Sequence, residues 1–127
     1  MEYNFTQEQL VKLESILTED LIEIGVHCVI LIDTAGNIVA RCDNGKCEHD
    51  VYSLAALGAG NFGAVNAMAQ IVGEDEFSLL FHKGENESLH FSKINSNFLL
   101  ITIFGKEVSL GFLRLRVAEV INKLRGV

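Results

Sequence analysis

The middle of this chain constrains its fold more than any other segment, because the 23 residues of segment 51–73 include no charged side chain. An ordinary surface helix places Lys and Glu on its solvent side. Asp50 precedes the segment as a candidate N-cap, and Gly73 follows it as a helix terminator. The sequence therefore predicts a helix that runs to about Val72 and has no charged face.

The two sides of this helix differ in side-chain size rather than in charge. At about 100° per residue, one side is expected to pack on a sheet and carries Leu54, Gly58, Val65, Met68 and Val72. The opposite side carries only Tyr52, Ala56, Ala59, Gly60, Gly63, Asn66, Ala67 and Gln70. Each interior glycine costs a helix about 1 kcal/mol relative to alanine. Close approach of another backbone is the expected compensation.

Two explanations of the uncharged side are open from these residues alone: a helix buried all round by its own domain, or a protein–protein interface. The interface is favoured, because the two other predicted helices are needed on the far face of the sheet. If two copies pair through this helix, the contact is self-complementary and the oligomer is a two-fold dimer. An edge strand containing Phe77, Leu79 and Phe81 could pair with its mate, which would also protect that edge.

The rest of the chain predicts two further helices and five strands. Thr6 and Gln9 have the spacing of a capping box, which opens a helix that ends at Gly25. A last helix starts near Ser109 and carries an apolar stripe from Leu110 to Leu124. The expected strands are 26–33, 38–42, 76–82, 88–94 and 98–104.

The order α-β-β-α-β-β-β-α predicts an α+β sandwich. Its five-stranded, largely antiparallel sheet would have one helix on one face and two on the other. Strand 98–104 is apolar on both faces, so it is expected in the middle of the sheet. With 127 residues and no linker, residues 1–127 are expected to form a single domain.

Composition excludes several classes of protein. Apolar residues make up 49% and charged residues 21%, which argues against disorder. A net charge of −7 argues against a protein that binds nucleic acid through its phosphates. Three cysteines and no signal peptide favour a cytoplasmic protein over a disulfide scaffold. No apolar run approaches the ~20 residues of a membrane span.

Cys42, Cys47 and His49 are the only candidate metal cluster in the sequence. Zinc motifs usually pair such a cluster with a second one at similar spacing, and none follows here. The expectation is therefore a polar loop with two ordinary thiols and no bound metal.

Two histidines at the ends of neighbouring strands are the candidates for acid–base chemistry. His82 and His90 could face each other across a short turn, together with Glu85 and Glu87. A histidine at a strand end in a solvated turn is far more common than a catalytic one. No catalytic residue is assigned, and the protein is not expected to be an enzyme.

The sequence offers no nucleotide-binding loop. Residues 58–63 match the pattern G-x-G-x-x-G, but this pattern must follow a strand and open a helix, whereas here it lies inside one. No P-loop is present, so no cofactor is expected. The four arginines could each reach into another protein's active site, although a solvated surface role is the default. They are Arg41, Arg114, Arg116 and Arg125.

Four stretches of the chain together resemble the roadblock family, named after a dynein light chain, and above all its bacterial branch that regulates Ras-like gliding and polarity GTPases. They are VILIDTAGNIVAR (29–41), LAALGAGNFGA (54–64), EFSLLFHKGENESLHFSKI (76–94) and VSLGFLRLRV (108–117). The segment FHKGE followed by SLGFLRLRV is the specific part. Gly105 departs from the family, where an acidic residue is expected after the last strand.

The resemblance implies a five-stranded antiparallel sheet with the middle helix on one face and the terminal helices on the other. It implies a homodimer in which the middle helices pack together and the third strands pair. It also implies no enzymatic activity, but binding to a small GTPase and stimulation of its hydrolysis. Two other functions stay open: a dimeric scaffold that tethers a GTPase or a motor, and a small-molecule sensor.

Overall fold

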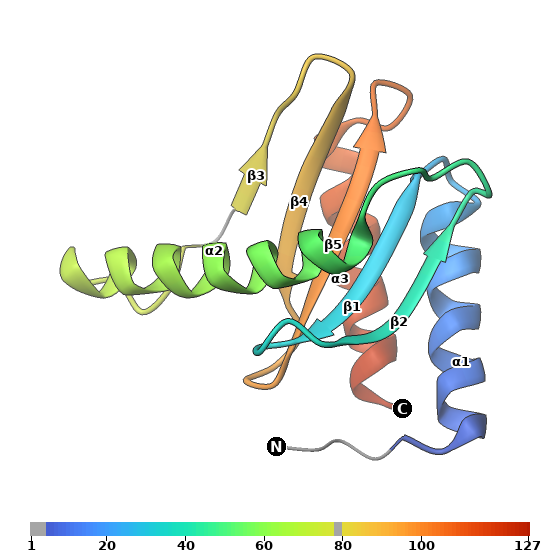
Figure 1. Ribbon diagram of the computed structural model, residues 1–127, viewed down its shortest axis with the longest axis horizontal. Coiled ribbons are helices and arrows are strands. Elements are labelled where there is room, and N and C mark those ends of the chain that lie inside the picture. Colours follow the sequence, from blue (N-terminus) through green and yellow to red (C-terminus); the bar gives the residue numbers. More distant parts are fainter. Residues whose placement is uncertain (1–4, 78–79) are drawn as a thin grey trace.

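A computed structural model describes residues 5–77 and 80–127, and the elements follow in the predicted order (Figure 1). They are α1 (Gln7–Leu17), the π-helical segment η1 (Thr18–Ile22), β1 (Cys28–Asp33), β2 (Ile38–Asp43), α2 (Val51–Ile71), β3 (Leu80–His82), β4 (Glu87–Lys93), β5 (Phe98–Gly105) and α3 (Leu110–Arg125). No helix within the described residues is long and apolar enough to cross a membrane.

The five strands form one sheet in the order β2-β1-β5-β4-β3, and every neighbouring pair is antiparallel. β5 lies in the centre, and every residue after Phe98 in it is buried. The position predicted from its apolar character is therefore confirmed.

The two faces of the sheet bury separate cores, because successive residues of a strand point to opposite sides. Ile30 and Ile101 point toward α2, whereas Leu31 and Leu100 point toward α1 and α3. Figure 1 shows α2 alone in front of the sheet, with α1 and α3 behind it. The predicted division of one helix against two is confirmed.

The first helix starts with the predicted capping box. Thr6 Oγ1 accepts a hydrogen bond from the Gln9 backbone N–H at 3.1 Å, and Gln9 Oε1 accepts one from the Thr6 N–H at 2.9 Å. The helix does not continue as an α-helix to Gly25, since η1 follows α1. Leu13, Leu17 and Leu21 are all buried. Residues spaced four apart point in gradually different directions in an α-helix, which has about 3.6 residues per turn. The wider π-helical turn compensates for this rotation, so Leu21 still faces the same core.

The third strand differs most from its prediction. The described strand covers only Leu80–His82, whereas residues 76–82 were expected. Glu76 and Phe77 precede it in irregular structure, and residues 78–79 lie outside the described part of the chain. The strand is at the edge of the sheet, as expected, with β4 as its neighbour.

Candidate functional site

Helix α2 crosses the strands and continues beyond the sheet on the side of β3 (Figure 1). With 21 residues it is about 31 Å long, whereas five strands span only about 19 Å between the outermost strand axes. Val51, Ala55 and Gly58 are buried in its first half, and Ala69 is the only buried residue of its second half. The second half therefore projects from the body of the domain.

Gly58 is a glycine because the sheet lies against it. A Cβ at this position would be 2.6 Å from Ile101 Cδ1 and 3.3 Å from Phe91 Cε1. By contrast, a Cβ at Gly60 or Gly63 would meet no atom within 4 Å. Contact within the domain thus accounts for only one of the three interior glycines.

The outward side of α2 is close to the predicted one but is rotated toward Leu57 and Ile71. Of the eight residues predicted to face outward, Tyr52, Ala56, Gly60, Gly63, Ala67 and Gln70 are exposed. Ala59 and Asn66 are half-buried. Met68 and Val72 were expected to pack on the sheet, and this expectation is wrong: their exposed fractions are 53% and 67%.

The sequence reasoning also missed two large apolar residues that the helix exposes. Leu57 is 71% exposed and Ile71 is 84% exposed. We call the exposed, uncharged surface of the helix the α2 face. It consists of Tyr52, Ser53, Ala56, Leu57, Gly60, Gly63, Ala64, Ala67, Met68, Gln70, Ile71 and the C-cap residue Val72.

The predicted interface residues of the third strand lie in different surroundings. Phe77 is 42% exposed. Phe81 is half-buried, and its ring stacks on Phe104 with centroids 5.9 Å apart, on the side of α1 and α3. Leu79 lies outside the described residues. The side chain of Phe81 therefore belongs to the core of its own domain.

The sequence left it possible that His82 and His90 face each other, and the structure shows that they do not. Phe81 is opposite His90 in the sheet and His82 is opposite Leu89, so the two histidines point to opposite faces. His90 is buried, and its Nδ1 lies 3.1 Å from Ser92 Oγ. Burial lowers the pKa of His90 to about 4, and the positive charge of Arg114 contributes to this lowering.

The candidate metal residues do not converge. The Cys42 thiol donates to the Glu14 carbonyl oxygen at 3.5 Å on the α1 side of the sheet. Cys47 packs into the opposite core, close to the fully buried Cys28. Desolvation raises the pKa of Cys28 to about 12. Within the described residues, no group of three or more His, Cys, Asp or Glu side chains has the arrangement of a metal site.

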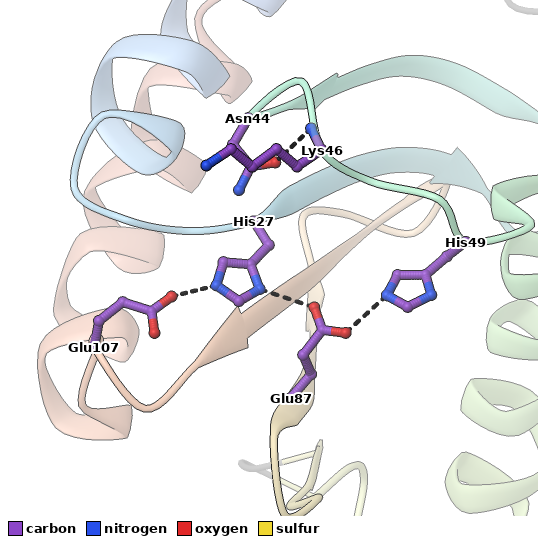
Figure 2. Close-up of polar contacts among 6 residues, drawn as sticks. All are labelled: His27, Asn44, Lys46, His49, Glu87 and Glu107. Atoms are coloured by element: carbon purple, nitrogen blue, oxygen red, sulfur yellow. Dashed lines mark hydrogen bonds and ion pairs between the residues drawn. The ribbon is translucent and has the colours of Figure 1, made fainter.

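A cluster that the sequence reasoning missed joins four distant segments (Figure 2). His27 Nδ1 lies 2.8 Å from Glu87 Oε2, and His27 Nε2 contacts Glu107 Oε1. His49 Nε2 lies 2.8 Å from Glu87 Oε1. We call these four residues the His27 cluster. No local motif in the sequence signals it, because each residue comes from a different turn or strand end.

His27 and the two carboxylates that it contacts shift one another's pKa values. The hydrogen bond to Glu87 contributes most to the raised pKa of His27; contact with Glu107 also raises this pKa, and partial burial opposes both. The hydrogen bond from His27 holds the pKa of Glu87 below its usual value. The pKa of Glu107 is lowered first by its own backbone N–H and then by His27.

A hollow of about 230 Å³ lies at the edge of β4, between α2 and α3. Phe62, Val117 and the buried His90 contribute to its lining, together with the ion pair of Lys93 Nζ with Glu76 Oε2 at 3.4 Å. Two pairs of its polar groups contact each other, His90 with Ser92 and Lys93 with Glu76. These four groups are therefore engaged within the protein, which does not favour a sensor that binds a small molecule through them.

The architecture is that of a small three-layer α+β domain with an exposed, uncharged α2 face. The chain belongs to the Roadblock/LC7 domain family, whose model matches residues 17–104.

Several solved structures share the fold over nearly the whole chain. The gliding protein MglB from Thermus thermophilus is 27% identical, with a TM-score of 0.85, and the match covers 94% of this chain and 90% of that one. Myxococcus xanthus MglB is 31% identical with a TM-score of 0.82, covering 96% and 91%. A structure of MglB with a tetrameric arrangement is 26% identical with a TM-score of 0.86, covering 94% and 90%. A comparison with curated protein sequences gave no match.

Proposed function

We propose that this protein is a non-enzymatic, homodimeric regulator that binds a Ras-like small GTPase in the cytoplasm and stimulates its GTP hydrolysis. The observation that carries the proposal is the α2 face, an exposed helix surface without a charge in a chain of the roadblock family. The similarity to the gliding protein MglB of Thermus thermophilus and to Myxococcus xanthus MglB supports the GTPase pathway that the resemblance to the roadblock family implies.

Self-association follows from the apolar content of the α2 face. Leu57, Met68 and Ile71 are each more than half exposed, although soluble monomers rarely expose contiguous apolar patches of this kind. Gly60 and Gly63 would let two helix backbones approach closely, which would compensate for their cost in the helix. The tetrameric arrangement of a similar MglB structure is consistent with self-association.

Three of the four arginines are engaged within the chain, which favours stimulation without an inserted arginine. Arg41 Nη2 lies 3.2 Å from Asp43 Oδ2, Arg116 Nη1 lies 3.5 Å from Glu119 Oε2, and Arg125 Nε donates to the Ile94 carbonyl oxygen at 2.9 Å. The proposed mechanism is that one GTPase lies across the two-fold axis of the dimer, whose surface orders the GTPase's own catalytic residues.

The test is the GTP turnover of a cognate GTPase with and without this protein. We expect faster turnover, and we expect Arg41→Ala, Arg114→Ala, Arg116→Ala and Arg125→Ala each to retain most of the stimulation. Loss of an inserted arginine would instead reduce the effect by ~10³-fold or more. Binding with unchanged turnover would favour a scaffold that only tethers the GTPase. Failure to bind any Ras-like GTPase would exclude both functions.

A further inference from the structure

The His27 cluster adds side-chain contacts to segments that the sheet already joins, since the His27 backbone N–H donates to the Ile103 carbonyl oxygen and Glu87 is opposite Gly105 (Figure 2). His27 precedes β1, Glu87 begins β4, and Glu107 lies in the turn between β5 and α3. His49 belongs to the loop that leads into α2, and it binds the second oxygen of Glu87 at 2.8 Å. His27 and Glu87 therefore form the middle of a chain of contacts that runs from Glu107 to His49.

We propose that His27 is a proton-operated latch that holds the β5–α3 turn when its ring carries two protons and releases Glu107 when the ring loses one. A doubly protonated imidazole donates from both nitrogens, so it satisfies Glu87 and Glu107 together. A neutral imidazole has one N–H and satisfies only one carboxylate.

Exposure decides which carboxylate is released. The side chain of Glu107 is 52% exposed, whereas that of Glu87 is 35% exposed. Water therefore reaches the Glu107 carboxylate more readily than the Glu87 carboxylate, and it can replace the hydrogen bond that His27 donates to Glu107. The neutral ring keeps its proton on Nδ1, toward Glu87.

Among the described residues, Glu87 and Glu107 are the charged groups that shift the pKa of the His27 ring. Asp43, which is opposite Cys28 in the β1–β2 pair, is paired with Arg41. The loop after β2 contributes Lys46, whose backbone N–H donates to Asn44 Oδ1 at 3.0 Å. The turn itself contributes Lys106, next to Glu107 in the sequence. Both carboxylates of the cluster face the ring directly, so they dominate its protonation.

The part of the turn that the latch releases is short. Val108 is buried and holds the far end of the turn against Gly25, where a Cβ would be only 3.1 Å from Val108 Cγ2. The backbone adds one long hydrogen bond, from the Val108 N–H to the Gly105 carbonyl oxygen at 3.4 Å. Release of Glu107 therefore loosens residues 106 and 107, while Gly105 stays paired with Glu87 in the sheet and α3 stays in place.

Nuclear magnetic resonance tests the latch on the whole protein. The His27 ring is titrated, and amide exchange in the turn is measured on both sides of its pKa, corrected for the intrinsic effect of pH. We expect a His27 pKa above 6.5, and protection of residues 106 and 107 that falls about threefold or more as pH rises through it. A pKa at or below 6.5, or equal protection on both sides, overturns the proposal.

Two variants separate the latch from a general loss of structure. Glu107→Gln removes the carboxylate from an exposed position, and we expect low, pH-independent protection of the turn and a lower His27 pKa. His82→Gln is the matched control, because His82 is an exposed histidine on β3, outside the cluster. It should retain the wild-type pH dependence of the turn. A pH-dependent turn in Glu107→Gln would contradict the latch.

Discussion

His27 and Glu87 lie 60 positions apart in the sequence, yet His27 Nδ1 is 2.8 Å from Glu87 Oε2. His27 directly precedes β1 and Glu87 begins β4, and these strands are not neighbours, because β5 runs between them. The contact spans the end of β5, where Gly105 is opposite Glu87 in the sheet. A Cβ at Gly105 would lie 2.8 Å from His27 Cε1 and 2.7 Å from Glu107 Oε2. The family resemblance implies an acidic residue at this position, and the glycine found there instead leaves space for this contact.

Replacing Gly105 tests this explanation. We expect Gly105→Asp to lower the free energy of unfolding by about 1–3 kcal/mol, because its side chain overlaps the ring of His27 and adds a third carboxylate. Gly105→Ala should be milder, since it adds bulk without charge. Urea unfolding at neutral pH measures both. Equal stability of Gly105→Asp and the wild type would show that the ring does not occupy this space.

The proposed dimer gives a second prediction with a matched pair of variants. We expect Gly63→Glu to turn the dimer into a monomer that remains folded, because a charge buried without a partner at the interface costs several kcal/mol. Gly111→Glu should remain dimeric. Both glycines are exposed in helices, and a Cβ at either meets no atom within 4 Å.

Light scattering coupled to gel filtration reads out the masses, and circular dichroism checks the fold. A wild-type mass near 14.0 kDa at high loading would refute the homodimer itself. Loss of the dimer in both variants would mean that α3, and not only the α2 face, contributes to the contact.

His90 predicts an acid sensitivity of the fold. Its pKa is lowered from 6.5 to about 4 by burial, so the folded protein keeps the ring neutral while the unfolded chain takes up a proton. This contribution to stability is present above pH 6.5 and is lost as the pH falls through the folded pKa. The full shift corresponds to an upper limit of about 3 kcal/mol.

The variant His90→Gln should therefore lose less stability than the wild type between pH 6.5 and pH 4. Thermal unfolding across this range is the measurement. His82→Gln again serves as the control, because His82 is exposed at the sheet edge. A wild type and His90→Gln with the same pH dependence would contradict a neutral, buried ring.

The parts of the fold that depend on neighbouring residues could be predicted from the sequence. Asp50 and Gly73 mark the ends of α2, since Asp50 Oδ1 accepts from the Ser53 N–H at 3.1 Å and Gly73 has a φ of +86°. The apolar character of 98–104 gives β5 its central place. Each of these signals arises within one turn or one strand.

The exposed end of α2 and the His27 cluster could not be predicted. They depend on how wide the sheet is and on which residues meet at its ends, and no local sequence pattern contains this information. Met68 and Val72 have the spacing of core residues, but they are exposed because the helix extends beyond the edge of the sheet. Ala59 was expected to face outward and is half-buried, so it is a poor site for testing assembly. The His27 cluster formed from four turns and strand ends that only the completed sheet brings together.

The projecting second half of α2 also affects the quality control of this protein in the cell. A newly made protomer displays Leu57, Met68 and Ile71 on a projecting helix until another surface covers them. Exposed apolar side chains of this kind are what chaperones and proteases recognise. We expect surplus protomers to be removed, so that the steady-state amount of the protein follows the amount of surface available to cover this helix.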